Sequence, residues 1–145
     1  MGVRLGRNAK LYRNTATYGS PTWAEIEIVR DLSVPMSREE ISADVRGSAF
    51  KLYAAGMAKI GIDFEILLDH DHADYVALLA AFTARTALDI FACTGAYNTS
   101  GEYYLRCDMK ICDFSLGQPL KDKSVVTVSL KPCYSTNAVT ISEVT

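Results

Sequence analysis

The sequence predicts a mainly β fold, a sandwich or barrel with one flanking α-helix. Apolar and polar residues alternate with a period of two over most of the chain, which is typical of half-buried strands. Stretches rich in Gly, Pro, Ser and Asn separate the alternating segments. Residues 74–85 instead place apolar side chains at helical spacing. Since the chain has 145 residues, we expect a single domain over residues 1–145, with residues 1–8 as a flexible N-terminal arm.

Three long segments carry most of the strand prediction. Residues 59–68 place large apolar side chains on one face and Lys, Gly, Asp and Glu on the other. Residues 122–133 alternate in the same way and are rich in valine, whose β-branched side chain favours the extended backbone. Residues 102–114 alternate until Asp113 and Phe114 break the phase, so we expect a β-bulge late in this strand.

Weaker patterns predict four further strands, at residues 9–13, 24–36, 39–45 and 87–94. We expect the second of these strands to bend around Arg30 and Asp31. Turn-forming residues lie between the strands, at residues 18–21, 94–96, 98–101 and 116–119. Many short strands separated by such turns are typical of a sandwich or barrel.

The helix follows a cluster of ionisable residues: Asp69, His70, Asp71 and His72. Asp is a preferred N-cap residue, because its carboxylate accepts hydrogen bonds from free N–H groups of the first turn. We therefore expect Asp71 to cap the helix and Asp74 to lie at the positive end of the helix dipole. The alternative is a metal site, because His70 and His72 share a face if the backbone is extended. Such a site needs a third ligand from elsewhere, and the imidazoles diverge if the helix has begun at Asp71.

The composition argues against several classes of function. With 15 Lys and Arg against 17 Asp and Glu, the net charge is −2, which argues against a broad basic face for nucleic acid. The 4 cysteines form no C-x-x-C pair, so we expect reduced thiols. No nucleophile motif or phosphate-binding loop occurs, so we expect no enzyme, metal or cofactor. No apolar run approaches ~20 residues and no signal-peptide core is present, so we expect cytoplasmic synthesis and no membrane association.

An ordered series of motifs covers residues 21–135. It opens with PTWAEIEI, which has a W-x-E-[IV] pattern at Trp23, and continues with VRDLS around Asp31. A charged stretch that ends in RGS follows, then the strand GMAKIGIDF, and then an acidic turn into an alanine-rich helix. Later, residues 114–135 read FSLGQPLKDKSVVTVSLKPCYS and match a closing pair of strands. In this order the motifs resemble those of phage tail tube proteins, the major tail proteins of long-tailed phages.

The resemblance implies a virion structural protein whose subunits self-assemble into hexameric rings. In that family the rings stack into the hollow tail tube through which phage DNA passes into the host, without specific binding. The implied partners are other copies of the chain, the tape measure, the terminator and the baseplate or tip. The implied location is the phage tail in the virion, after assembly in the host cytoplasm. Head-to-tail rings use heterologous interfaces, in which sheet edges can pair with the next subunit.

Two groups of residues are candidates for roles in such a tube. Residues 38–56 combine charged, strand-like sequence with aromatic residues that follow no strict period, so we expect contacts between subunits or rings there. The predicted contact residues are Arg38, Glu40, Ser42, Asp44, Arg46, Phe50, Lys51 and Tyr53. An ordinary exposed hairpin followed by a core-packing segment is the alternative. The predicted lumen-lining residues are Asp63, Glu65, Asp108 and Lys110, which lie on polar strand faces.

Two other functions stay open from the sequence. A tube protein of a contractile or secretion-type injection machine would have a similar fold, and neighbouring genes would distinguish the two systems. A monomeric ligand-binding or metal-binding β-barrel would use His70 and His72. Such a protein would stay monomeric at every concentration and would bind zinc or a small ligand.

Overall fold

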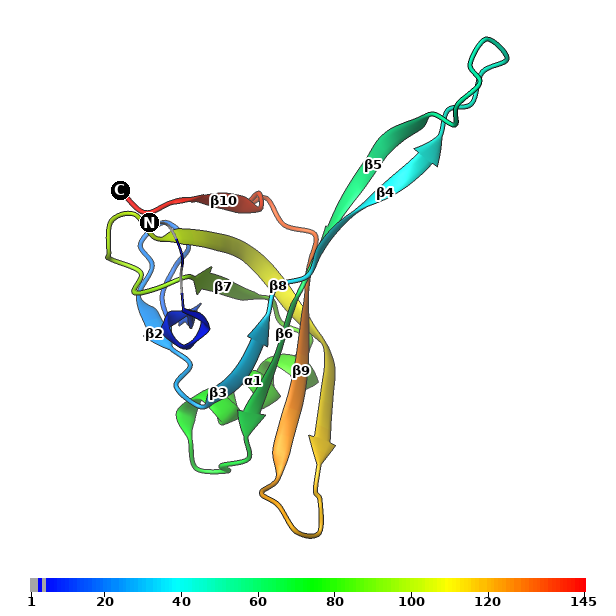
Figure 1. Ribbon diagram of the computed structural model, residues 1–145. Helices are drawn as coiled ribbons and strands as arrows, with labels where there is room; N and C mark the ends of the chain where they lie inside the picture. Colours follow the sequence, from blue (N-terminus) through cyan, green and yellow to red (C-terminus); the bar gives the residue numbers. More distant parts are fainter. Residues whose placement is uncertain (1–2, 4) are drawn as a thin grey trace.

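A computed structural model describes residue 3 and residues 5–145 (Figure 1). Residues 1, 2 and 4 of the predicted N-terminal arm lie outside the described residues. In chain order the elements are the 3-10 helix η1 (Gly6–Asn8), β1 (Lys10–Asn14), β2 (Trp23–Glu25), β3 (Val29–Ser33), β4 (Met36–Ser42), β5 (Tyr53–Ile60), β6 (Ile62–Leu67), α1 (Ala73–Ala84), β7 (Leu88–Cys93), β8 (Tyr103–Gly117), β9 (Val125–Pro132) and β10 (Thr140–Glu143).

Most of the strands form one curved antiparallel sheet in the order β2-β1-β7-β8-β9-β6-β3, with β10 paired to β8. The long strand β8 joins its two halves, because its first part pairs with β7 and β10 and its later part pairs with β9. The end strands β2 and β3 follow each other in the chain but do not pair, so the sheet is not a closed barrel. The predicted mainly β fold with one helix is confirmed.

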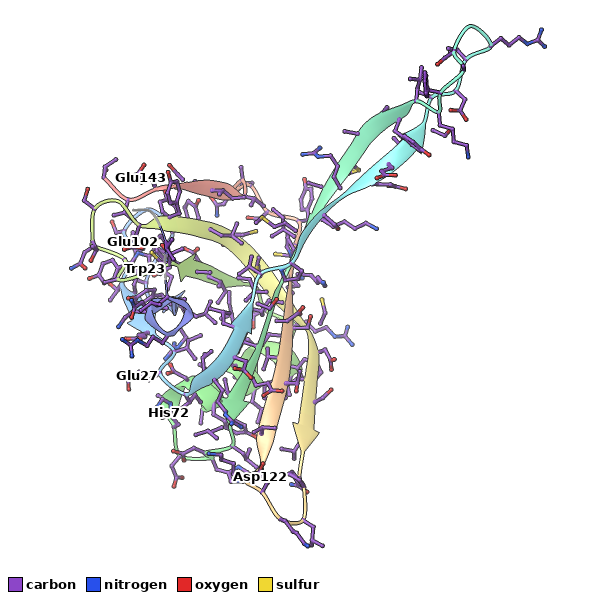
Figure 2. All side chains as sticks on the ribbon, viewed as in Figure 1. Trp23, Glu27, His72, Glu102, Asp122 and Glu143 are labelled. Atoms are coloured by element: carbon purple, nitrogen blue, oxygen red, sulfur yellow. The ribbon has the colours of Figure 1, made fainter. Side chains whose placement is uncertain are left out.

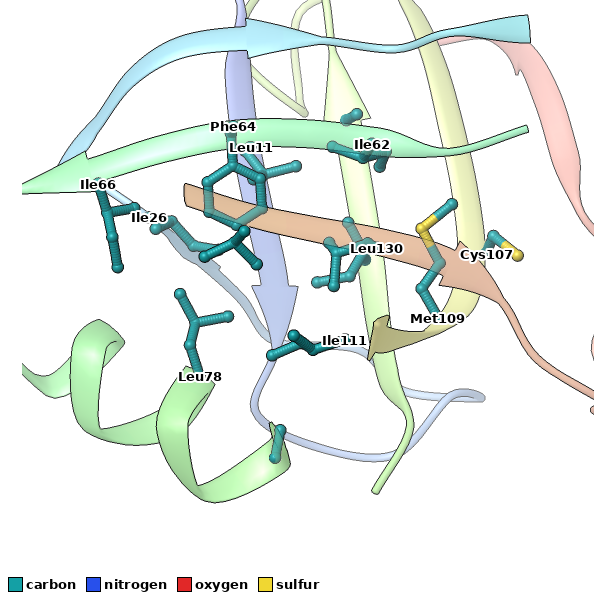
Figure 3. Packing of buried hydrophobic residues seen from close by; sticks show 14 of the residues in the cluster. Leu11, Ile26, Ile62, Phe64, Ile66, Leu78, Cys107, Met109, Ile111 and Leu130 are labelled. Carbon is teal, nitrogen blue, oxygen red and sulfur yellow. The ribbon is translucent and has the colours of Figure 1, made fainter. Parts of the chain in front are cut away.

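The core lies on the concave side of this sheet, where α1 closes it (Figure 3). Ile62, Phe64 and Ile66 of β6 are almost fully buried, as are the alternate residues of β8 and β9 beside them. Leu78, on the inner side of α1, packs into the same cluster. We call this side of the sheet the core face. Because side chains alternate along a strand, the residues between the buried ones lie on the opposite face.

The predicted bulge in β8 is confirmed. Ile111 pairs with Leu130 and Asp113 pairs with Ser129, so Cys112 is the extra residue between them. The bulge restores the phase, because Phe114 then packs against the core although Asp113 faces away from it. The phase break in the sequence is therefore the signature of one inserted residue.

Two strand boundaries differ from the prediction. Residues 24–36 form β2 and β3 with a break between them, and the register of β3 on β6 shifts between Val29 and Leu32, where the bend is predicted. Residues 59–68 form the end of β5 and all of β6, separated at Gly61. The Gly61 N–H donates to the Pro35 carbonyl at 3.1 Å instead of joining a ladder. At this point the chain passes from the β4–β5 pair into the main sheet.

The β4–β5 hairpin projects from the body of the protein as a separate two-stranded sheet (Figure 1). The periodicity predicts only the end of the strand β5, from residue 59, because alanine and glycine give its earlier residues little alternation. The predicted strand at residues 39–45 is β4, which starts earlier, at Met36. Neither helix in the described residues has the length and apolar character of a membrane span.

Candidate functional site

The hairpin is held together by specific contacts along its length. Arg38 donates to the Gly56 carbonyl at 2.9 Å, and the Leu52 N–H donates to Asp44 at 3.1 Å near the tip. Two residues of β5, Gly56 and Met57, oppose the single residue Glu39 of β4, which makes a bulge. A Cβ on Gly56 would lie 3.0 Å from the Glu39 carbonyl oxygen, so a side chain at this bulge would push against the backbone of β4. The hairpin therefore has a defined shape.

Both faces of the hairpin expose large apolar side chains. Met36 and Tyr53 lie on one face, because Met36 and Ser42 are an even number of residues apart and Tyr53 pairs with Ser42. Ile41 lies on the opposite face. Met57 at the bulge and Phe50 at the tip are each 82% exposed. Figure 2 shows side chains that project from both sides of this ribbon into open space. Exposed apolar surface of this kind is typical of an interaction site.

The predicted contact residues of the hairpin therefore lie where a partner could reach them. All eight are exposed, on β4, in the tip or at the start of β5: Arg38, Glu40, Ser42, Asp44, Arg46, Phe50, Lys51 and Tyr53. Ser42 and Asp44 also hydrogen-bond to each other at 3.0 Å, so part of their role is local. The alternative of a core-packing segment after the hairpin is wrong, because Phe50, Leu52 and Tyr53 are outside the core.

The four predicted lumen-lining residues share the face of the sheet opposite the core. Asp63 and Glu65 alternate with the buried residues of β6, and Asp108 and Lys110 alternate with those of β8. Between these strands, β9 contributes Thr127, Ser129 and Lys131 to the same face. We call this surface of β6, β8 and β9 the polar face. It brings together residues that are up to 68 positions apart in the chain (Asp63 and Lys131).

Hydroxyl and amide groups bind the carboxylates of the polar face. The Ser129 hydroxyl donates to Asp63 at 2.6 Å. Ser135 and Asn137, in the segment between β9 and β10, donate to Asp108 at 2.5 and 2.9 Å. These hydrogen bonds fix the carboxylates in place without using the lysines of the same face.

An ion pair absent from the prediction fastens the β1–β2 connection across this side of the sheet. Arg106 of β8 donates to both carboxylate oxygens of Asp89 at 2.7 and 3.2 Å, and to the Tyr18 carbonyl at 2.8 Å. Its guanidinium lies 3.8 Å from the centre of the Tyr18 ring and 4.9 Å from that of Trp23. The hydrogen bond to Asp89 raises the pKa of Arg106 above its ordinary value, against the opposite effect of burial. The sequence carries no local signal for this cluster, because strand pairing creates it.

The predicted helix cap at Asp71 is wrong. The helix begins at Ala73, so His72 occupies the N-cap position, and its Nδ1 accepts from the Asp74 N–H at 3.2 Å. The Asp71 N–H instead donates to the Asp69 carboxylate at 3.1 Å, in a turn before the helix. Asp74 lies in the first turn, as predicted, where it is buried and accepts from Arg13 at 3.0 Å. A histidine ring nitrogen thus does what a carboxylate was expected to do.

The two histidines have separate surroundings. The ring of His70 meets that of Tyr75 edge to face at 5.6 Å, whereas His72 serves as the cap. Within residue 3 and residues 5–145, no three His, Cys, Asp or Glu side chains are placed to hold a metal ion.

The chain is similar to known proteins in its structure and not in its sequence. No protein-family model matches the chain, and no curated protein matches it in sequence. Among solved structures, a chain of the SPP1 tail tube aligns with a TM-score of 0.73 at 9% identity, over 89% of this chain and 75% of that one. The chain shares its fold with the SPP1 tail tube. The predicted resemblance to tail tube proteins is therefore confirmed at the level of the fold.

Two further structures extend the likeness. A chain from the tail of the empty gene transfer agent (GTA) particle, computed with C6 symmetry, aligns with a TM-score of 0.73 at 10% identity, over 97% of this chain and 99% of that one. A chain of the anti-feeding prophage (AFP) baseplate, 6-fold symmetrised, aligns with a TM-score of 0.61 at 8% identity, over 94% and 93% of the two chains. The fold shared with these structures thus covers nearly the whole chain, and at 8 to 10% sequence identity only the fold is comparable.

Proposed function

We propose that the chain is a structural subunit of a phage tail tube, which assembles into hexameric rings that stack around a channel for DNA. The observation that carries this proposal is the alignment of 97% of the chain with a chain of a tail that has C6 symmetry. Because the alignment covers nearly all of both chains, the strands and the hairpin that would form the ring contacts lie within the aligned part.

The hairpin supports the proposal on physical grounds. An isolated two-stranded hairpin is at best marginally stable in water, and three or more strands or a packing surface are normally needed. Here both faces of the ribbon expose large apolar side chains, with Met36 and Tyr53 on one and Ile41 on the other. We infer that neighbouring subunits cover these faces in the tube, through the eight contact residues of the hairpin. Contacts of this heterologous kind build rings and stacks.

The polar face is the surface that we assign to the channel. It is a broad sheet surface whose hydroxyls and fixed carboxylates offer DNA few sites of strong attachment, because phosphates are repelled by Asp63, Glu65 and Asp108. Lys110 at its margin carries the opposite charge. A channel that passes DNA needs such a surface, since tight phosphate binding would stop the movement.

The location and the partners follow from this role. The subunit would be part of the phage tail in the virion, after assembly in the host cytoplasm. Its main partner would be itself, and the ends of the tube would meet the terminator and the baseplate or tip, with the tape measure inside during assembly. The role is structural, so no residue is assigned to catalysis.

Negative-stain electron microscopy of the untagged chain over a range of concentrations tests the function. We expect rings or hollow tubes from the wild type. The double variant Phe50→Ser/Tyr53→Ser should stay folded by circular dichroism and form neither, because both side chains belong to the exposed apolar surface of the hairpin. The matched control is Leu120→Ser/Tyr134→Ser, which removes even more exposed side chains from loops of the body and should assemble normally.

Two outcomes would contradict the proposal at different points. Tubes of normal length from the Phe50→Ser/Tyr53→Ser variant would remove the hairpin from the assembly contacts. A wild-type chain that stays monomeric at every concentration, and that does not add to sonicated tube fragments used as seeds, would remove the tube function itself.

The alignment with the AFP baseplate chain supports a second candidate, a ring-forming component of an injection machine of the contractile or secretion type. Its TM-score of 0.61 is below the 0.73 of the two tail structures, which favours the tail tube of a phage. The same micrographs distinguish the candidates, because a baseplate-type ring would stop at single rings whereas a tube subunit stacks them.

A further inference from the structure

A row of lysines crosses the polar face where the hairpin leaves the sheet. Lys110 of β8 and Lys131 of β9 are direct cross-strand partners, so both side chains project from the same face. Lys131 also extends over β6, since its Nζ lies 2.9 Å from the place that a Cβ of Gly61 would occupy. The glycine thus makes room for the ammonium group. Lys59 at the end of β5 lines the same hollow of about 450 Å³ as Lys131.

These three ammonium groups have no carboxylate partner within residue 3 and residues 5–145. None of the ion pairs between described residues includes Lys59, Lys110 or Lys131. The carboxylates of the same face beside the row, Asp63, Asp108 and Asp113, accept hydrogen bonds from neutral hydroxyl and amide groups of Ser129, Ser135, Asn137 and Ser115. The row therefore places three ammonium groups next to one another, outside any ion pair of the described residues, in a chain whose net charge is −2.

The pairing of Lys110 with Lys131 is unfavourable on its own, because like charges directly opposite in a sheet destabilise it. An anion between them relieves this repulsion. A phosphate group suits the site, since lysine binds phosphate as a mobile point charge and all three side chains are exposed. Three charges in one row can contact only a few phosphates at a time, which gives weak and salt-sensitive binding.

We propose that Lys59, Lys110 and Lys131 form a phosphate-contacting row that touches the backbone of DNA moving along the polar face. The identity of the ligand as DNA rests on the proposed tube function, and the anion site itself rests on the geometry of the row. In a ring the row is repeated by each subunit, so DNA meets a band of positive charge between surfaces that are otherwise acidic. Such a band centres the duplex while each contact stays weak enough to break.

Fluorescence anisotropy of a labelled 30-base-pair duplex, with the protein kept below its assembly concentration, tests the row. The site variant is Lys59→Gln/Lys110→Gln/Lys131→Gln. The control is Arg30→Gln/Lys121→Gln/Lys123→Gln, which removes the same charge from β3 and from the β8–β9 loop. With about three phosphate contacts, wild-type affinity should fall roughly 40-fold between 50 and 200 mM salt. The site variant should bind at least about tenfold more weakly at 50 mM and lose most of this salt dependence, whereas the control should stay within about twofold of the wild type.

Any other result would contradict the proposal that the three lysines contact phosphate. Equal weakening in both variants would mean diffuse charge attraction, and no binding by the wild type at 50 mM salt would mean no phosphate site. If the site variant binds DNA normally but no longer forms tubes, the lysines contact carboxylates of a second copy instead. Because anisotropy uses the unassembled chain, a protein that shows lysine-dependent binding but forms no tubes would break the tube function and leave the phosphate site intact.

Discussion

Large apolar side chains occur both in the body of the protein and in its β4–β5 hairpin, but they are buried in the body and exposed in the hairpin. In the body, Phe64 is 1% exposed and packs among aliphatic side chains of β6, β8 and β9. In the hairpin, Phe50 is 82% exposed and the whole of β4 faces solvent. The body therefore has a core of its own, whereas the apolar residues of the hairpin have no place in that core. The difference indicates that the body folds around its own core, and it is the difference that the proposed assembly through the hairpin requires.

The largest expected difference in stability is between substitutions of Phe64 in the core and of Phe50 in the hairpin. Phe64→Ala should lower the free energy of unfolding by about 3 to 5 kcal/mol, because it leaves a cavity in the core. Phe50→Ala should change it by less than about 0.5 kcal/mol, because it is a surface substitution. Urea unfolding below the assembly concentration measures both. A cost above 1 kcal/mol for Phe50→Ala would mean that the hairpin packs on the body of the free chain.

The next largest effect concerns how the free energy of unfolding of the body depends on pH. Burial is the main cause that raises the pKa of the Cys107 thiol from 9.0 to about 11. The folded state thus favours the protonated thiol. The stability that this preference contributes is fully present below pH 9 and is lost as the pH rises toward 11. Between these values the wild type should lose about 2 to 3 kcal/mol more than Cys107→Ala.

Unfolding curves at pH 8, 9.5 and 10.5 measure this difference. Cys112→Ala is the matched control, because Cys112 is the exposed bulge residue of the same strand. It should follow the wild type at every pH. Equal pH dependence in all three proteins would mean that Cys107 is not kept from solvent.

A smaller effect tests the start of α1, which also belongs to the body. His72→Ala should cost about 1 kcal/mol, because the Asp74 N–H loses its side-chain acceptor. His72→Asn should recover most of this loss, since an amide oxygen can accept the same bond. Thermal unfolding measures the series. If Asp71→Ala costs more than His72→Ala, the cap lies one residue earlier than in the structure.

The smallest effect on unfolding comes with a large effect on assembly. Gly56→Ala places a Cβ 3.0 Å from the Glu39 carbonyl oxygen, so the bulge of the hairpin must shift. Because the body does not use the hairpin, the free energy of unfolding should change by less than about 0.5 kcal/mol. Tubes should nevertheless be lost in negative-stain micrographs. Gly47→Ala, which meets no atom within 4 Å, is the control and should assemble normally.

Much of the fold follows from local patterns in the sequence. Alternation locates β6, β8 and β9, and the loss of phase at Asp113 locates the bulge to one residue, because a side chain can face the core only at every second position. The series of motifs over residues 21–135 identifies the tail tube fold. The helix is found from its spacing to within one residue at each end.

The remaining features depend on contacts between distant parts of the chain. Three features arise only when strands pair in a particular register. They are the ion pair of Arg106 with Asp89, the lysine row, and the placement of Asp63 and Asp108 on one face of the sheet. Most of the strand β5 is also hard to find from the sequence. Its side chains do not alternate between the core and solvent, because almost all of them are exposed. The sequence by itself determined which residues can be strands and which face each one buries, since these follow from local backbone geometry. Only the tertiary structure decided which polar side chains meet, because register is a property of two strands together.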